Sequence, residues 1–455
     1  MDKHTLWSLR LGYSNKQATI IKEMGLPNFL ANSFEVKIDR EIPKFLENSP
    51  KNLREYVQIR KDAKLQDHQF LIELQKKERQ AFDDLNSWWI KKMSQSEFPL
   101  CEKMTCFWHN HFVASFHKIK VVNLVFQHNQ ILRDNAFGNF KTLTKKIVQS
   151  NATIYYLDNN DNKKGKLNEN LSRELLELFT LGIGNYTEDD IKNGAKGLAG
   201  LSVGDEGAKY RALFEDNEIF SYFGKEGAFK IEDMIDIIFE QKNIPYLITR
   251  KILKWFIYDN PPEDLVHYYG DYLKKVNFEI KPLLNKIFLE EFFKDNSGSK
   301  IKNPLEFILQ LIDELQIQNN KEKNIANFIK IQGMELFNQP NVKGWIGGNY
   351  WLTSQIYLQR NKLVDTYCNR NLLESRKKEE TTEPINTLLD WIKNKDNKQI
   401  IFELKERLLF KISEKDQQDF EEILKYDFDS NSEGAKNGVL RLINFMAKSP
   451  EFQLI

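Results

Sequence analysis

Two histidines stand close together in the segment from residue 107 to 112, which reads FWHNHF. Imidazole transfers protons near neutral pH and binds divalent metal ions, so such a pair is a candidate for either chemistry. On a helix, His109 and His111 point about 200° apart because they are two residues apart, and they cannot bind one ion from the same face. A histidine among aromatic residues is also often a hydrogen-bonded core residue, and both interpretations stay open.

A second group of ionisable residues lies in the stretch from residue 168 to 179, which reads NENLSRELLELF. Glu174 and Glu177 are three residues apart and are therefore neighbours on one face of a helix. Acidic residues near a helix start interact favourably with the helix dipole, and Arg173 can form a salt bridge with them. Stabilisation of the helix start is one explanation of this pattern, and a functional site is the other.

The functional explanation joins the two segments. Carboxylates and imidazoles that meet in one place can hold a divalent metal ion or perform acid–base catalysis. We therefore expect one polar cleft with six candidate catalytic residues: His109, His111, Glu169, Arg173, Glu174 and Glu177. The candidate metal ligands among them are His109, His111, Glu174 and Glu177.

A third segment, from residue 336 to 351, reads LFNQPNVKGWIGGNYW and has the composition of an ordered loop. Aromatic rings with polar tips suit the recognition of sugars or peptides, so Asn341, Trp345 and Trp351 are candidate binding residues. Packing of the two indole rings in the core is the other interpretation.

No standard catalytic motif accompanies these segments. The sequence contains neither a His-Glu-x-x-His pattern nor a glycine-rich phosphate loop with its lysine, and it has no nucleophile elbow. The usual hydrolase and nucleotide-binding classes are therefore disfavoured.

Apolar residues recur at helical spacing through most of the chain. This spacing predicts several helices over residues 52–118 and a second helical block over 121–149. A polar, asparagine-rich loop over 158–170 then leads into a helix over 171–181, which a glycine ends. The next helix is expected to begin at Thr187, where TEDD places an acid at the capping-box position.

Strands are expected in one place, a small hairpin flap over residues 208–229. Helical spacing returns over 231–315, with breaks at 259–262 and 295–304. The charged stretch SRKKEETTE, residues 375–383, is typical of an exposed linker, and a helical segment follows it. The sequence thus predicts an all-α body with a small β-hairpin flap.

The composition narrows the partners and the compartment. The 66 Lys and Arg residues nearly balance the 65 Asp and Glu residues, so no global positive field favours nucleic acid as a partner. The sequence has no apolar run of signal-peptide or transmembrane length, which predicts a cytoplasmic protein without a transmembrane segment. A periplasmic location stays open, because a leader can be removed or the protein can be exported with another.

Several motifs together resemble the family of bacterial proteins known as domain of unknown function 1800 (DUF1800). The resemblance begins near Leu6 with LWSLRLGYS and extends to about Leu363. Its motifs, in order, are FWHNHF, RDNAFGNF from Arg133, YLDN from Tyr156, NEN followed by RELLELFTLG, and the loop from Asn341 to Trp351. Arg133 and Asp158, which lie within these motifs, are added as binding candidates.

The resemblance implies a DUF1800-like helical domain over residues 1–370, with a C-terminal helical extension over 371–455 packed on it. The family has no established activity. Its genes often neighbour those of proteins that look like sulfatases and alkaline phosphatases, which implies a partner of that kind. Family members usually carry a His-Asp pair where this chain reads Phe214-Glu215-Asp216-Asn217, which weakens a metal site or restricts it to a harder ion.

Two functions are therefore expected as alternatives. The first is a metal-dependent or acid–base enzyme of envelope or polysaccharide metabolism that uses the His/Glu cleft. The second is a noncatalytic scaffold or binding subunit that works with the sulfatase- or phosphatase-like partner.

Overall fold

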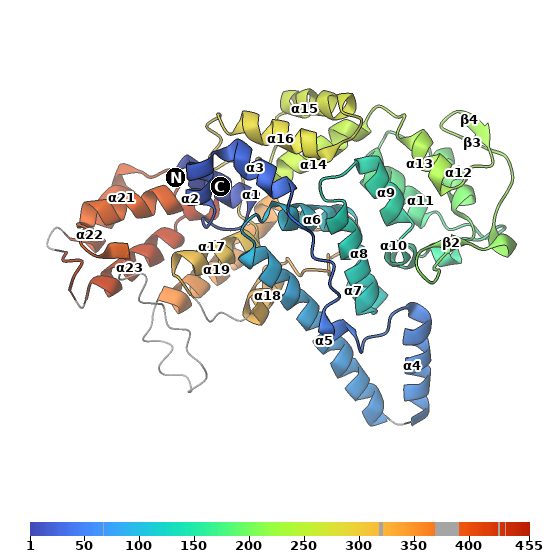
Figure 1. The fold of residues 1–455 in the computed structure, drawn as a ribbon, viewed down its shortest axis with the longest axis horizontal. Helices are drawn as coiled ribbons and strands as arrows, with labels where there is room; N and C mark the ends of the chain where they lie inside the picture. The colour runs from blue at the N-terminus through green and yellow to red at the C-terminus, as the bar shows by residue number, and fades with distance from the viewer. Residues whose placement is uncertain (67, 318–321, 369–390, 426–427, 433) are drawn as a thin grey trace.

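The computed structural model describes residues 1–66, 68–317, 322–368, 391–425, 428–432 and 434–455. Within these ranges the chain is mainly α-helical and carries two small antiparallel sheets, which confirms the predicted fold class. Figure 1 shows an elongated molecule with the C-terminal helices at one end and the small sheets at the other.

The first third of the chain forms helices that carry the histidine segment into the centre of the molecule. These elements are α1 (Lys3–Leu11), α2 (Ala18–Met24), α3 (Leu26–Phe34), the 3-10 helix η1 (Lys44–Leu46), α4 (Leu53–Gln66), α5 (His68–Gln95), α6 (Leu100–His111), α7 (Phe116–Ile119), α8 (Val122–Asp134), α9 (Phe140–Val148) and α10 (Asn151–Tyr156). Helices α4 and α5 form a hairpin that projects from the body (Figure 1). Helix α6 contains the first five residues of FWHNHF, and Phe112 is its C-cap. The helix is buried along its whole length except at Asn110, which is half-buried.

The middle of the chain contains both small sheets. Its elements are the 3-10 helix η2 (Asn159–Asp161), α11 (Asn170–Glu174), the π-helix η3 (Leu175–Thr180), α12 (Glu188–Leu198), β1 (Leu201–Ser202), β2 (Lys209–Tyr210), the 3-10 helix η4 (Ala212–Phe214), β3 (Phe220–Tyr222), β4 (Lys225–Gly227), α13 (Ile231–Ile238), α14 (Ile244–Phe256), α15 (Glu263–Lys275) and α16 (Ile280–Glu291). Strands β3 and β4 form a hairpin inside the predicted flap. Strand β2 also lies in the predicted flap, but it pairs with β1, which precedes the flap in sequence. Thr187 caps α12 in a capping box with Asp190, as TEDD predicts.

The last part of the chain is helical. Its elements are α17 (Pro304–Glu314), α18 (Glu322–Ile331), the 3-10 helix η5 (Gly348–Trp351), α19 (Ser354–Cys368), α21 (Asn397–Leu408), α22 (Glu414–Ile423), α23 (Ala435–Ala447) and the 3-10 helix η7 (Glu451–Gln453). The segment after α23 returns to the body, where Gln453 accepts a hydrogen bond from Arg360 at 3.0 Å. The predicted linker over 375–383 and the predicted boundary at residue 370 lie outside the described residues. Among the described helices, none combines the length and the apolar character that a membrane crossing requires.

Asparagine side chains order the polar loop that precedes α11. Asn159 donates to the carbonyls of Leu198 and Leu201 at 3.1 and 2.7 Å, and it accepts from Asn162 at 3.2 Å. The Oδ1 of Asn162 then accepts from the backbone N–H of Asn168 at 3.1 Å. Because asparagine side chains replace missing backbone partners in turns, this loop is fixed and sets the start of α11.

A buried ion-pair network ties α6 to the first turn of α17 and the residues just before it. Glu306 pairs with Lys103 at 2.8 Å and with Lys300 at 3.1 Å, and all three side chains are almost completely buried. Burial alone would raise the pKa of Glu306, but the two ammonium groups outweigh it and hold that pKa below its usual value. A charge removed from water is tolerated only while its partners are present, so this network fixes the relative position of the two segments.

Replacing Glu306 with Gln should lower the free energy of unfolding by about 3–5 kcal/mol, because two buried ammonium groups then lack a counter-charge. Urea denaturation at neutral pH measures this loss. Glu290→Gln is the matched control, since Glu290 pairs with Lys286 at the surface, where its side chain is 37% exposed. A loss below about 1 kcal/mol is expected there. Similar losses in the two variants would contradict the structural role of the network.

Candidate functional site

Helix α11 continues directly into η3, whose last carbonyl groups receive hydrogen bonds from other elements. The N–H of Leu181 donates to the carbonyl of Leu176 at 2.9 Å, five residues back, and Gly182 N–H donates to the same oxygen at 3.1 Å. The final carbonyls of a helix need donors from outside it. Side chains of α6 and α14 supply these donors to Leu178 and Phe179.

His111 is the donor from α6, and its hydrogen bonds determine its protonation. Its Nε2 donates to the carbonyl of Phe179 at 3.1 Å. A carbonyl only accepts, so the proton of the neutral ring lies on Nε2, and Nδ1 is left as an acceptor for Lys251 Nζ at 3.0 Å. Burial first, and then the positive charge of Lys251, hold the pKa of His111 well below its usual value.

Lys251 is the donor from α14. Its Nζ donates to the carbonyl of Leu178 at 2.8 Å in addition to the bond with His111. Burial lowers the pKa of Lys251 to about 8, and no carboxylate of the described residues forms an ion pair with it. The carbonyl end of η3 carries partial negative charge and is therefore the main stabilising partner of the ammonium form.

His111 and Lys251 lie in the wall of a cavity of about 350 Å³. The cavity combines large rings with several charges. Its aromatic lining residues besides His111 are Phe107, Trp255, Trp345 and Trp351. Its charged lining residues besides Lys251 are Lys254, Asp259, Lys300 and Lys343.

Asn110 fixes the loop that carries two of these tryptophans. Its Oδ1 accepts a hydrogen bond from the backbone N–H of Trp345 at 2.6 Å. A Cβ at Gly344 would lie 2.3 Å from the same oxygen, and Gly344 has a φ of +82°, so this close approach requires glycine. The exposed Asn341 accepts from the backbone N–H of Lys343 at 2.9 Å, so it shapes the turn before the cavity rather than lining the cavity.

Asp259 is a second titratable group of the cavity. Its Oδ2 accepts from the backbone N–H of Ile301 at 2.9 Å, and burial raises its pKa. The cavity therefore contains an amine whose pKa is lowered and a carboxyl group whose pKa is raised. Such opposite shifts in one cavity are typical of sites that perform acid–base chemistry.

His109 is not among the lining residues of this cavity. It is completely buried, and Gln339 donates to its Nδ1 at 3.1 Å and to its backbone carbonyl at 3.0 Å. Its ring packs against Trp89, His128 and Phe337. Burial holds its pKa well below the usual value. The two histidines thus serve separate networks, as their spacing predicts, and His109 has the contacts of a core residue rather than of the predicted catalytic one.

The ionisable residues around Arg173 form an ion-pair cluster of their own. Arg173 pairs with Glu169 at 3.1 Å, with Glu177 at 3.5 Å and with Glu188 at 3.0 Å. Its side chain is 34% exposed, and ion pairs of this exposure contribute little to stability individually. This arrangement matches the stabilising interpretation of the sequence pattern.

Glu174 interacts electrostatically both with Glu177 of this cluster and with Lys343 of the cavity. Burial is the main cause that raises its pKa, Glu177 adds to the increase, and the cavity residue Lys343 opposes it. Among the residues that the structure describes, no three His, Cys, Asp or Glu side chains are grouped as a metal ion requires. The four predicted metal ligands are therefore not gathered around one point. Of the six predicted catalytic residues, only His111 lines the cavity.

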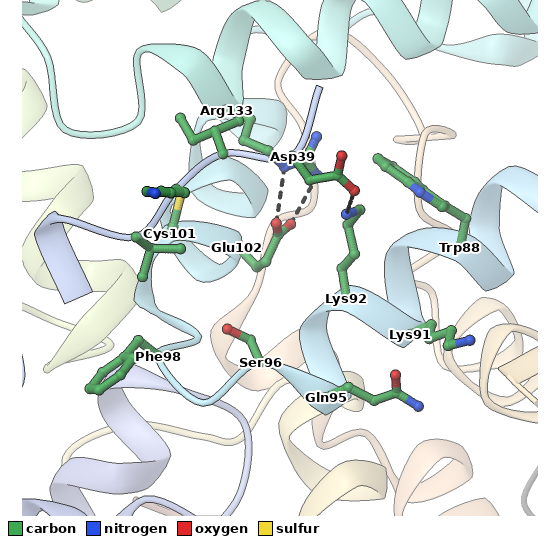
Figure 2. A pocket seen from close by; sticks show the side chains of 13 residues that line it. Asp39, Trp88, Lys91, Lys92, Gln95, Ser96, Phe98, Cys101, Glu102 and Arg133 are labelled. Carbon is green, nitrogen blue, oxygen red and sulfur yellow. Dashed lines mark hydrogen bonds and ion pairs between the residues drawn. The ribbon is translucent and has the colours of Figure 1, made fainter. Parts of the chain in front are cut away.

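Arg133 lines a different cavity, of about 390 Å³, which Figure 2 shows. Its guanidinium donates to both carboxylate oxygens of Glu102, at 3.0 and 2.9 Å, and lies 5.0 Å from the Trp88 ring. Because the two charges are buried and satisfy each other, they hold α8 against α6 instead of offering a free charge. Asp158 lines neither cavity and pairs with Lys118 at 2.6 Å near the surface.

Sequence reasoning missed Lys251, Lys254 and Asp259, which belong to no motif. One signal for Lys251 is present in α14, because it follows the buried Ile248 by three residues and precedes the buried Trp255 by four. A lysine on the apolar face of an amphipathic helix must find special partners, which makes it worth testing.

The comparisons with known proteins agree with the recognised motifs. A family model described as "Protein of unknown function (DUF1800)" matches residues 4–454. The match therefore includes the C-terminal helices, beyond the part in which the motifs were recognised. No curated protein and no solved structure matches the chain.

Lys251 should accept a label at its amine with a pH midpoint near 8, because burial destabilises its ammonium form. Trace labelling with acetic anhydride across a pH series, followed by peptide mass spectrometry, measures this midpoint. In the urea-unfolded protein the same lysine should titrate at about 10.4. A midpoint that is the same in the folded and the unfolded protein would refute the assignment.

Proposed function

This chain belongs to the DUF1800 family, and we propose that its cavity at His111 and Lys251 binds an anionic sugar-like substrate and transfers a proton to or from it. The observation that carries the proposal is the environment of Lys251, a cavity amine bound to an imidazole and a carbonyl. The buried Lys103 and Lys300, in contrast, pair with the carboxylate of Glu306.

The count of protons on Lys251 supports a role in proton transfer. An ammonium group has three N–H donors. Two of them go to His111 Nδ1 and Leu178 O, which leaves one without a protein acceptor among the described residues. Since Lys251 lines the cavity, a bound ligand is a natural partner for that third proton. A pKa of about 8 lets the group give up or take up a proton near physiological pH.

The charges and rings of the cavity support an anionic, ring-shaped ligand. Lys254 and Lys343 add positive charge to its wall, whereas Lys300 is already paired with Glu306. Like charges in a cavity raise the local concentration of an oppositely charged ligand. The rings of Trp345 and Trp351 offer faces for a sugar ring. Acidic sugars of envelope polysaccharides have this combination of carboxylate and ring.

Asp259 can supply the proton-donating group that complements Lys251 as a base. A carboxyl group whose pKa is raised by burial can retain a proton at a pH where an exposed one has lost it. Asp259 is therefore the candidate acid of the cavity, and Lys251 in its amine form is the candidate base. Of the two enzyme types expected from the sequence, this proposal develops the acid–base enzyme. A metal-dependent enzyme is not developed because the described residues contain no group of three His, Cys, Asp or Glu side chains that could hold a metal ion.

A noncatalytic binding subunit remains the second candidate, and the cluster around Arg173 favours it. That cluster is closed by ion pairs and lies outside the cavity, so it gives no sign of catalysis. In this form the cavity would hold an anionic sugar for a sulfatase- or phosphatase-like partner that performs the chemistry.

Binding of an acidic sugar should depend on Lys251. Isothermal titration calorimetry with galacturonate oligomers should show a loss of affinity of about tenfold or more in Lys251→Met, the expected cost of a charge-assisted hydrogen bond. Trp351→Ala should also weaken binding because it removes a ring face. Lys275→Met is the matched control, since Lys275 is an exposed lysine of α15 outside the cavity. Equal binding by Lys251→Met and the unaltered protein would refute the proposed site.

Turnover separates the enzyme from the binding subunit. Proton NMR of the bound oligomers over a day should show new sugar products with the unaltered protein and none with Lys251→Met. Binding without any product would favour the noncatalytic candidate.

A further inference from the structure

We infer that Lys251 acts as a nucleophile that forms an imine with the aldehyde or ketone group of an anionic substrate. The inference rests on the proposed cavity and assigns to its ligand a carbonyl carbon beside the negative group. It assigns to Lys251 a covalent step in addition to proton transfer.

The geometry of the neutral amine leaves its lone pair free to react. A neutral amine has two N–H bonds and one lone pair. Both acceptors of Lys251, which are Leu178 O at 2.8 Å and His111 Nδ1 at 3.0 Å, can be satisfied by the two N–H bonds. The lone pair of a tetrahedral nitrogen then points away from both acceptors. Because Lys251 forms part of the cavity wall, the remaining direction is available to a carbonyl carbon in the cavity.

The tautomer of His111 is fixed by its other hydrogen bond, so the ring keeps accepting from the amine of Lys251. Its Nε2 proton is committed to the carbonyl of Phe179 at 3.1 Å, so Nδ1 stays an acceptor. The ring is itself buried, with 4% of its surface exposed. His111 is therefore a positioning residue for the amine and is not the reacting group.

Another buried lysine provides an internal comparison. Lys103 donates to the carbonyls of Leu9 and Gly12, both at 2.7 Å, and pairs with Glu306 at 2.8 Å. All three of its N–H donors therefore have acceptors, and Lys103 does not line the cavity at Lys251. Burial lowers the pKa of Lys103 to about 8 as well. A low pKa alone therefore does not distinguish Lys251, whereas its free third position and its cavity do.

Two further lysines line the cavity around the amine of Lys251. Lys254 follows Lys251 by three residues on α14, so both lie on one face of that helix and line the same cavity. Lys343, on the loop before η5, also lines the cavity. These two ammonium groups can hold a carboxylate while the neighbouring carbonyl carbon approaches Lys251. An anionic carbonyl compound therefore matches the cavity better than an uncharged one.

The reaction balances without a further reagent. The nitrogen lone pair of Lys251 forms a bond to the carbonyl carbon, and the electrons of the C=O bond move to the oxygen, which takes up a proton. That proton is one of the two N–H protons of the amine, which leaves a hydroxyl group on the carbon and one N–H on the nitrogen. The hydroxyl group takes a second proton and leaves as water, the nitrogen gives its last N–H proton back to the group that supplied it, and a C=N bond remains. Asp259, the carboxyl group of the same cavity, is the candidate donor of the proton that the departing hydroxyl group requires.

Reductive trapping tests the inference. The full chain is incubated at pH 7.5 with glyoxylate, an anionic aldehyde, and sodium cyanoborohydride, and lysine-bearing peptides are quantified by mass spectrometry. We expect a carboxymethyl group on Lys251 at least about tenfold more often than on exposed lysines, because its amine form is more populated. Glycolaldehyde, which carries no charge, should show a smaller preference. Lys251→Arg keeps donors to His111 and Leu178 and should abolish the modification at this position, while Lys275→Met should leave it unchanged.

The outcomes separate this inference from the proposed function. If galacturonate oligomers bind in a Lys251-dependent way but Lys251 is trapped no faster than exposed lysines, the imine inference is overturned and the proposed site stands. If Lys251 is trapped selectively and galacturonate does not bind, the covalent role stands and the sugar-like substrate class is wrong. Failure of both measurements would overturn both.

Discussion

The carbonyl groups at the end of η3 require hydrogen-bond donors, and this requirement organises the candidate site. Leu178 and Phe179 receive their donors from α14 and α6, so three elements that are far apart in sequence meet at one point. Because the Nε2–H of His111 donates a hydrogen bond to the carbonyl of Phe179, its Nδ1 can only accept one from Lys251. The protonation of the ring, the position of the amine and the wall of the cavity all follow from this contact.

The surrounding fold keeps these groups in place. Helix α6 lies in the core, and its buried polar groups are held by Glu306, Arg133 and Gln339 from three other segments. Asn110, the residue of α6 that is only half-buried, attaches the loop with Trp345. One helix therefore supports both the histidine and the aromatic part of the cavity. Ionic contacts fix its position, and these contacts lose their stabilising effect if one partner is removed.

Much of the fold could be predicted from residue patterns, because helical spacing and capping residues act locally. The helix that Thr187 begins is an example, and so is the separation of His109 from His111 by their spacing. The site was predicted only in part, because Lys251 and Asp259 reach it from segments without a recognisable pattern. The acidic residues near Arg173 were grouped correctly, but the sequence could not show that they satisfy one another at the surface.

The proposed function requires that Lys251 faces a ligand cavity with one N–H donor that no described protein group accepts. A crystal structure of the protein with a bound galacturonate oligomer tests this directly. We expect the sugar carboxylate within hydrogen-bond distance of Lys251 or its neighbour Lys254, with the sugar ring against Trp345 or Trp351. A structure in which Lys251 pairs with a carboxylate of the protein, or in which the sugar binds elsewhere, would contradict it.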